Sequence, residues 1–432
     1  MSRRYKLLVM SHLSSANPLA AGIRIPPALT KSFAATQAAW RFYANESVSL
    51  QMLLGPLIEL AKEQIPSLCS NYVLTVLDWS NLHFESHDSK KDKTRLSRGN
   101  NQGYKLLSAL TLSDQEGTPI APVCVELTAK DGVHSSRRQK VLPTESSLDS
   151  LTPVIEHVAG LELGRRPVMI IDAEADSVAH YRQWNKKGHL FLIRSDAQRL
   201  VTFENHELPQ GEVAGKIPLV SSGKVSYKGR ELGRFIGQTQ VTLARPARQH
   251  RVIKGKKRHV DIPGEALTLR LVVSELRDQT GKAIARWLLL TNVPEEIGAL
   301  VITDWYLWRW RIEDCHKQLK GAGQQVESWQ QETAESLCKR LCVALMSLSL
   351  VWQLAREPST EAGELREVLV RLSGRQIKRG KGRPTFTISA LLTGLGILLP
   401  ALAMLEELGR GKLQTLVDKL LPGLLAPGGD SG

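Results

Sequence analysis

Two short apolar runs, each followed by an aspartate, constrain the fold of this chain most strongly. Residues 72–77 (Tyr-Val-Leu-Thr-Val-Leu) precede Asp78, and residues 167–171 (Pro-Val-Met-Ile-Ile) precede Asp172. Short runs rich in β-forming residues predict buried strands. A carboxylate at the end of a buried strand is unusual, because charged side chains are rarely buried unless they are paired or bind a metal ion.

The neighbouring segments complete an α/β pattern. Two further strands are predicted at 103–112 and 119–127, with a turn between them, and a helix is predicted at 146–161. A helix at 173–187 and a strand at 188–193 follow. Three meandering strands followed by alternating helix and strand predict a mixed sheet with helices packed on it.

The two aspartates have a functional and a structural interpretation. Strand ends in open α/β sheets are where sites form, and two carboxylates on adjacent strands would offer the oxygen ligands that Mg²⁺ prefers. The structural alternative, strongest for Asp172, is a helix N-cap, because a helix is predicted to begin directly after it.

At 432 residues the chain is too long for one ordinary domain. The pattern of strands and helices predicts five regions. They are a helical N-terminal region (1–70), the first part of the α/β core (71–195), a β-rich insertion (196–292), the second part of the core (293–360) and a helical C-terminal region (361–432).

The charge favours a polyanionic partner. Lys and Arg outnumber Asp and Glu 57 to 43, a formal net charge of +14, which makes nucleic acid the first candidate and an anionic membrane the second. Residues 388–405 carry no charge, but their Ser, Thr, Gly and Pro content favours a buried helix or a subunit contact over a membrane span. The five cysteines form no CxxC pair, which argues against a disulfide framework and fits a reducing cytosol.

A third acidic residue lies in a long helix predicted over 295–320. At about 100° per residue, five of its side chains fall within about 80° of one helix face. This face could hold a metal with its carboxylate and phosphates with its cations. It could equally be a solvated face of i,i+4 ion pairs. The five residues are Tyr306, Arg309, Glu313, Lys317 and Lys320.

Four of these residues fit the pattern Tyr-x2-Arg-x3-Glu-x6-Lys without a gap. With the surrounding residues 310–323, the pattern resembles the signature of DDE transposases of bacterial insertion sequences, in the insertion-sequence-four family. The resemblance is closest to the cut-and-paste branch that forms a DNA hairpin, and it covers about residues 30–360. One departure is Ala173, where that branch usually has an arginine. A second is the short N-terminal region, where the hairpin-forming relatives have an extra leading helix.

The resemblance implies an RNase H-like core, with Asp78 on its first strand, Asp172 on its fourth and Glu313 on a later helix. It implies that these three residues are catalytic and hold two Mg²⁺ ions, for which Mn²⁺ can substitute. One ion would activate water and then a 3′-hydroxyl, and the other would stabilise the leaving oxygen. The implied reactions are nicking at the transposon end, hairpin formation and opening, and strand transfer into target DNA.

The resemblance also assigns residues that contact DNA. Tyr306, Arg309 and Lys320 would grip phosphates near the cut, and Lys317 lies on the same predicted face. Trp287 would stack on an extruded base, although a core position on a strand is an equal alternative.

The implied partners are double-stranded DNA, as transposon ends and target, and a second copy of the chain in the DNA complex, with no membrane. The resemblance thus implies that 1–70 is a DNA-binding region, that 361–432 has a possible role in dimerisation, and that the protein is cytoplasmic and nucleoid-associated. The alternatives are an RNase H-like nuclease without strand transfer and a non-catalytic DNA-binding derivative of a transposase.

Overall fold

The structure is a computed structural model. It describes residues 3–14, 32–96, 101–137, 141, 148–253, 256–321, 323–374, 378–379 and 384–420, so parts of the predicted N- and C-terminal regions lie outside the described residues. The chain forms two compact units, each assembled from segments far apart in the sequence. The first unit comprises 1–56, 82–104 and 316–432, and the second comprises 57–81 and 105–315.

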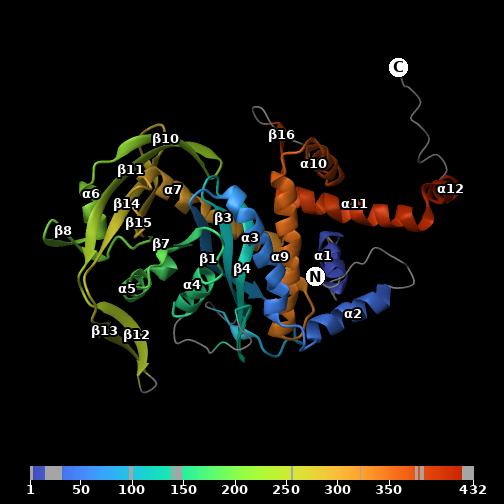
Figure 1. Ribbon diagram of the computed structural model, residues 1–432, viewed down its shortest axis with the longest axis horizontal. Helices are drawn as coiled ribbons and strands as arrows, with labels where there is room; N and C mark the ends of the chain where they lie inside the picture. The colour runs from blue at the N-terminus through green and yellow to red at the C-terminus, as the bar shows by residue number, and fades with distance from the viewer. Residues whose placement is uncertain are drawn as a thin grey trace. The chain divides into compact units, whose positions relative to one another are not determined.

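The second unit is built on a large mixed sheet (Figure 1), in agreement with the predicted α/β class. In the described part of the chain the strand order is β5-β4-β3-β1-β6-β7-β15-β14-β11-β8-β9, and β10 pairs with β11. The core strands are β1 (Tyr72–His83), β3 (Gln102–Ser113), β4 (Pro119–Ala129), β5 (Gly132–Ser135), β6 (Arg166–Ile171) and β7 (Leu190–Arg194).

The centre of this sheet is parallel. Strand β6 runs parallel to both β1 and β7, and the register pairs Leu77 with Ile171 and Ile171 with Ile193. The apolar residues of these strands are buried, as their sequence predicts. Strand β1 is longer than predicted, because it continues through Asp78 to His83 after its pairing with β6 has ended.

The strands within 196–292 extend this sheet beyond β7. Strand β15 pairs with β7, β14 pairs with β15, and β11 pairs with β14, all antiparallel. Strands β12 and β13 form a separate two-stranded ribbon. The bounds are β8 (Leu200–Phe203), β9 (His206–Pro209), β10 (Val220–Tyr227), β11 (Arg230–Leu243), β12 (Ala247–Ile253), β13 (Lys256–Ile262), β14 (Leu267–Arg277) and β15 (Ala283–Thr291).

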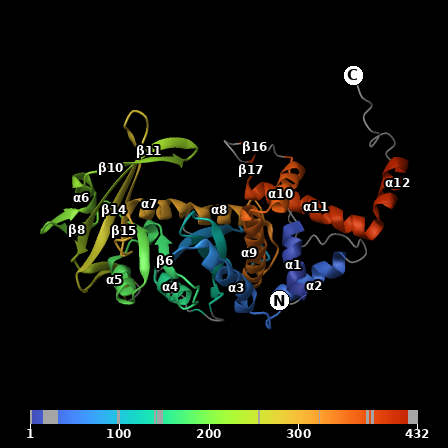
Figure 2. The ribbon, with the colours of Figure 1, turned by 45° about the horizontal axis from the view of Figure 1, so that its top comes forward.

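Helices pack on this sheet: α4 contacts β4 and β6, α5 contacts β7, and α7 runs across β11 and β14 (Figure 2). The helix predicted at 173–187 is broken, because Asp176 and Ser177 leave helical conformation. The helix predicted at 295–320 begins only at Ala299 and is interrupted by a tight turn at Arg309. The bounds are α4 (Leu151–Ala159), η1 (Ala173–Ala175, a 3-10 turn), α5 (Val178–Lys186), α6 (Gln210–Lys216), α7 (Ala299–Trp308) and α8 (Trp310–Leu319).

The first unit is mainly helical, and α9 forms its core. Helices α1, α2, α10 and α11 pack against α9, so that α1 lies beside a helix far from it in the sequence (Figure 2). Side chains cap three helices: Thr333 caps α9, Ser359 caps α10 and Thr387 caps α11. The bounds are α1 (Arg3–Ser14), α2 (Ser32–Ala44), α3 (Leu50–Leu68, shared between the units), β2 (Thr94–Arg95), η2 (Val326–Ser328), α9 (Ala334–Arg356), α10 (Thr360–Leu372), β16 (Lys378–Arg379), β17 (Pro384–Thr385), α11 (Ile388–Leu408) and α12 (Arg410–Leu420).

Two described helices are long and apolar enough to cross a membrane by length and composition. The apolar window of α9 is 83% buried inside the protein, as in a core helix, whereas that of α11 is 22% buried. The five cysteines are buried and form no disulfide bonds, in agreement with the absence of a disulfide framework expected from their spacing.

Candidate active site

Three carboxylates of the second unit face one guanidinium group. Arg309 Nη2 lies 3.0 Å from Glu313 Oε1 and 3.2 Å from Asp172 Oδ2, and Arg309 Nη1 lies 3.8 Å from Asp78 Oδ2. The Arg309 side chain is 5% exposed, and the three carboxylates are 20–29% exposed. The three acids predicted to act together therefore lie within reach of a single cation.

The parallel strands explain how two of these acids meet. Asp78, Asp172 and Arg194 each lie one position beyond the paired residues Leu77, Ile171 and Ile193. Residues in register on parallel neighbours lie about 4.8 Å apart, and Asp78 follows the last residue of β1 that pairs with β6, although β1 itself continues to His83. Two carboxylates and one guanidinium are thus side by side, and Arg194 Nε is 2.6 Å from Asp172 Oδ1.

The third acid is positioned through Asp114, in the turn between β3 and β4. The Asp114 carboxylate accepts hydrogen bonds from the backbone N–H groups of residues 70–72, where β1 begins. Its carbonyl oxygen accepts a hydrogen bond of 3.0 Å from the Trp305 indole, and the Trp305 ring packs edge-on against Tyr72. One turn therefore fixes β1 and α7 together, and α7 leads directly to Arg309 and Glu313.

Hydrogen bonds fix the orientation of Asp172. Its Oδ1 atom accepts hydrogen bonds from the Ala173 N–H, at 2.7 Å, and from the Tyr306 hydroxyl, at 3.0 Å, and it also faces Arg194. Oδ2 therefore faces Arg309. The predicted N-cap role is observed, because Asp172 caps the short η1 turn with this oxygen, and the role of Asp172 in a metal site stays a prediction.

Burial and charge shape the protonation of the site. Burial raises the pKa of Asp78 to about 6, the charge of Arg309 opposes this rise, and the negative charge of Glu313 adds to it. Burial by itself lowers the pKa of Arg309, but the neighbouring carboxylates, above all Asp172, outweigh this effect and raise the pKa. Lys105 lies with its Nζ 5.0 Å from the centre of the Trp79 ring, and burial lowers its pKa while Asp78 opposes that effect. A buried acid in a partly compensated cluster favours uptake of either a proton or a cation.

The remaining predicted residues are placed as follows. Tyr306 is 2% exposed, and its hydroxyl is directed to Asp172. Trp287 is 6% exposed and packs against the rings of Tyr227 and Tyr306. It thus has core packing, and stacking on an extruded base would require its ring to be uncovered. Lys317 and Lys320 belong to the first unit, where Lys320 Nζ lies 4.0 Å from Glu327 Oε1. Their contacts with DNA stay predictions.

Sequence reasoning missed Arg194 and Lys105. Arg194 could have been found by the rule that identified the aspartates, because it directly follows the apolar run 190–193 of the next parallel strand. No comparable signal marks Lys105, which lies within β3 and reaches the site only through sheet pairing.

No protein-family model matches the chain. Among solved structures it is similar to the cryo-EM structure of the piggyBac transposase synaptic complex with hairpin DNA. The TM-score is 0.36 and the sequence identity is 9%, over 99% of this chain and 77% of that chain. A likeness of this size carries no argument about function.

Proposed function

We propose that the chain is a metal-dependent DNA transposase of the DDE type that excises an insertion sequence and joins it to target DNA. The observation that carries the proposal is the convergence of Asp78, Asp172 and Glu313 on one buried guanidinium. Three carboxylates from separate elements would repel one another without a cation, so their gathering in one place favours a cation-dependent role.

The strand order supports an RNase H-like core, as the sequence resemblance implies. With the short β2 and β5 set aside, β1, β3, β4 and β6 are the first four core strands, in the spatial order β4-β3-β1-β6. Asp78 then lies on the first strand and Asp172 directly after the fourth, while Glu313 lies on the later helix α8.

The donor atoms fit Mg²⁺ or Mn²⁺. Three carboxylates provide hard oxygen ligands, which these ions prefer, and Asp78 is a buried acid whose ionised form a divalent cation would stabilise. Asp78, Asp172 and Glu313 would therefore hold the two ions. When bound, such ions supply Lewis-acid activation of the attacking and leaving oxygens of a phosphodiester.

Hydrogen bonds from neighbouring residues would orient the carboxylates for cation binding. The Tyr306 hydroxyl and the Ala173 N–H hold Oδ1 of Asp172, so that Oδ2 stays directed into the cluster. The Trp79 N–H donates to Asp78 Oδ1 at 2.8 Å and leaves Oδ2 facing the cluster. Such hydrogen bonds pre-orient ligand atoms and limit the reorganisation needed when a cation binds.

Arg309 would change partners during the reaction. It contacts Asp172 Oδ2 and Glu313 Oε1, the oxygens that face the cluster. Its guanidinium would release these oxygens to a cation and could then bind an oxygen of the DNA phosphate, for which its planar fork is suited. The exchange would explain why the resemblance predicts a phosphate contact for Arg309, whereas in this structure Arg309 contacts carboxylates.

The proposal includes the partners and the location expected from the sequence. The transposon ends and the target would be double-stranded DNA, and two copies of the chain would act together on the two ends. The C-terminal helices are the region proposed for the contact between copies. The protein would act in the cytoplasm, on the nucleoid.

The test is cleavage of a labelled duplex that carries the terminal sequence of the element encoding this chain, with Mg²⁺ or Mn²⁺. Glu313→Gln keeps the size of the side chain and removes its charge, and Asp314→Asn is the matched control on the same helix. A metal-dependent nick and a hairpin product that Glu313→Gln loses and Asp314→Asn keeps would support the proposal.

Cleavage that Glu313→Gln leaves unchanged would refute the assignment of the triad. Nicking without hairpin or strand-transfer products would favour the nuclease alternative. Specific binding without cleavage by either protein would favour a non-catalytic derivative.

A further inference from the structure

The first unit contains a buried arginine without a carboxylate partner. Arg340 lies in α9 and is 2% exposed, and its Nη1 atom donates a hydrogen bond of 2.9 Å to Gln331 Oε1. Its guanidinium lies 3.8 Å from the centre of the Trp329 ring. The Nε–H group has no hydrogen-bond partner, and no described carboxylate forms an ion pair with Arg340. Such a group calls for a counter-charge, because burying an unpaired charge is costly.

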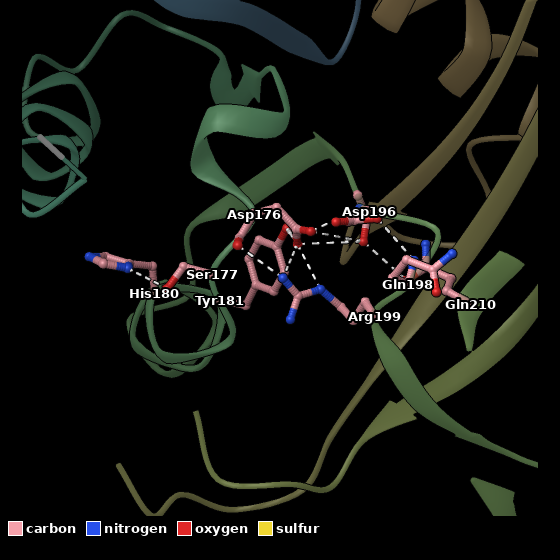
Figure 3. A network of polar contacts seen from close by, with 9 residues as sticks. Asp176, Ser177, His180, Tyr181, Asp196, Gln198, Arg199 and Gln210 are labelled. Carbon is pink, nitrogen blue, oxygen red and sulfur yellow. Dashed lines mark hydrogen bonds and ion pairs between the residues drawn. The ribbon is translucent and has the colours of Figure 1, made fainter. Parts of the chain in front are cut away.

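A buried arginine of the second unit shows how such a charge is compensated elsewhere in the chain. Arg199 Nε donates to the Asp176 carboxylate at 2.9 Å, within a network that also includes the Tyr181 hydroxyl (Figure 3). Burial by itself lowers the pKa of Arg199, but Asp176 outweighs this effect and raises it. For Arg340, burial lowers the pKa to about 9, and no carboxylate opposes it. Arg340 therefore lacks the counter-charge that Arg199 has.

A second buried cation contacts the same neighbour. Lys90 is 1% exposed, and its Nζ donates a hydrogen bond to the carbonyl oxygen of Gln331, the residue whose side chain accepts from Arg340. Burial lowers the pKa of Lys90 to about 8, Asp92 opposes this effect, and the charge of Arg340 adds to it. Two cations that repel each other are thus held by one residue in the interior, where an anion would stabilise both.

Two further donors near Arg340 are also unpaired. The Gln331 Nε2 atom and the Tyr43 hydroxyl are buried and have no hydrogen-bond partner in the described part of the chain. Burial raises the pKa of Tyr43, and the nearby charge of Arg340 opposes this rise. Buried polar groups normally have a partner, and a bound ion is one explanation for an exception. Three donors with a positive charge among them match an anion, which only accepts hydrogen bonds.

The sequence of the first unit offers few other acids for this role. Among the side chains of 1–56, 82–104 and 316–432 that the structure does not describe, the only carboxylates are those of Asp418 and Asp430. The whole chain carries a formal net charge of +14, so anions are its counter-ions in solution. A small anion taken up from solution is therefore a direct source of the missing negative charge.

We propose that the first unit binds a small monovalent anion of the size of chloride between Arg340, Gln331 and Tyr43. The Arg340 Nε–H, Gln331 Nε2–H and Tyr43 O–H groups would donate hydrogen bonds to it. A monatomic ion fits better than phosphate or a nucleotide, because the three residues are at most 2% exposed and protein interiors are close-packed. The inference is independent of the proposed function, since it involves neither DNA nor the acidic cluster.

The anion would join segments that are far apart in the sequence. Tyr43 belongs to α2 and Arg340 to α9, while Lys90 lies between β1 and β2 and Gln331 lies shortly before α9. Helix α2 packs on α9, and Ser336 Oγ on α9 donates to the Tyr43 carbonyl at 3.2 Å. The anion would therefore be a structural ion that stabilises the packing of the first unit around α9.

The test is equilibrium dialysis of the full chain, without DNA, against radioactive chloride in sodium gluconate buffer of constant ionic strength. Gluconate screens the charged surface but is too large for a closed interior site. The wild type should bind about one chloride ion per chain in a saturable way. Arg340→Met should abolish this binding. Tyr43→Phe removes one hydrogen bond to a charged ion and keeps the ring, so it should weaken the affinity about tenfold.

The matched control is Tyr5→Phe, which makes the same chemical change at another buried tyrosine of the first unit. Tyr5 is 4% exposed, and its hydroxyl donates to the Leu53 carbonyl at 3.3 Å. Tyr5→Phe should keep the chloride affinity of the wild type. If Arg340→Met does not fold, the comparison of Tyr43→Phe with Tyr5→Phe still decides between the outcomes.

A wild type without saturable chloride binding would overturn the inference. So would equal chloride affinity in the wild type and Tyr43→Phe, because the Tyr43 hydroxyl is one of the three donors. Equal losses in Tyr43→Phe and Tyr5→Phe would also overturn it, because they would indicate a general effect on the packing of the first unit.

Discussion

Replacing Asp78 with asparagine should stabilise the protein in the absence of metal. Asp78 is 20% exposed, and burial raises its pKa from 3.8 to about 6. At pH 7.5 the folded state therefore holds a carboxylate that it would hold more favourably as a neutral group. The difference in pKa corresponds to about 3 kcal/mol of unfolding free energy. Asparagine removes this cost and can still accept the hydrogen bond from the Trp79 N–H.

The stabilisation expected from Asp78→Asn depends on pH. Between about pH 4 and pH 6 the folded state binds the Asp78 proton more tightly than the unfolded state, so wild-type stability falls as the pH rises through this window. The advantage of Asp78→Asn should be full at pH 7.5 and should vanish towards pH 4. Urea unfolding with a chelator present, at both pH values, measures this difference.

Asp176→Asn is the matched control, because it makes the same chemical change at another acid of the same unit. Asp176 is paired with Arg199 and accepts several hydrogen bonds, so its replacement should cost about 3–5 kcal/mol. Destabilisation by Asp78→Asn at pH 7.5, or a benefit that does not change with pH, would refute the view that Asp78 is an only partly compensated acid that favours a cation.

Three further outcomes follow from the same cluster. Arg309→Gln should lower metal-free stability by about 3–5 kcal/mol at pH 7.5, measured by urea unfolding, because it leaves three carboxylates without their shared cation; unchanged stability would contradict this. Tyr306→Phe should slow cleavage while DNA affinity stays within about twofold, because its hydroxyl orients Asp172; a large loss of affinity would instead indicate a phosphate contact. Mn²⁺ affinity, measured by calorimetric titration, should fall as the pH drops below about 6 and Asp78 takes up a proton; a flat profile would exclude Asp78 as a ligand.

The sequence was sufficient to identify the acids because their environment is local and regular. Buried parallel strands are short apolar runs, and the first polar residue after such a run lies where the parallel pairing ends, even in β1, which continues to His83. That rule identifies Asp78 and Asp172, and it applies equally to Arg194, which follows the apolar run of the next parallel strand. Local sequence patterns therefore predict those residues of the site that directly follow a buried apolar run.

Features that depend on contacts between distant segments were not predictable. The helix expected over 173–187 is broken at Asp176, whose carboxylate accepts hydrogen bonds from the Asp196 N–H and from Arg199. No local sequence pattern predicts these contacts. The pairing of β15 with β7 likewise joins segments about a hundred residues apart, and no local sequence pattern predicts it.

The central claim is that Asp78, Asp172 and Glu313 form one metal-binding site. The most direct measurement is binding of Mn²⁺, followed by electron paramagnetic resonance, to the wild type and to Asp78→Asn, Asp172→Asn, Glu313→Gln and the control Asp314→Asn, each with the terminal-sequence duplex. The account expects bound Mn²⁺ in the wild type and in Asp314→Asn, and a loss of at least about tenfold in affinity in each of the other three. Equal Mn²⁺ affinity in all five proteins would contradict it.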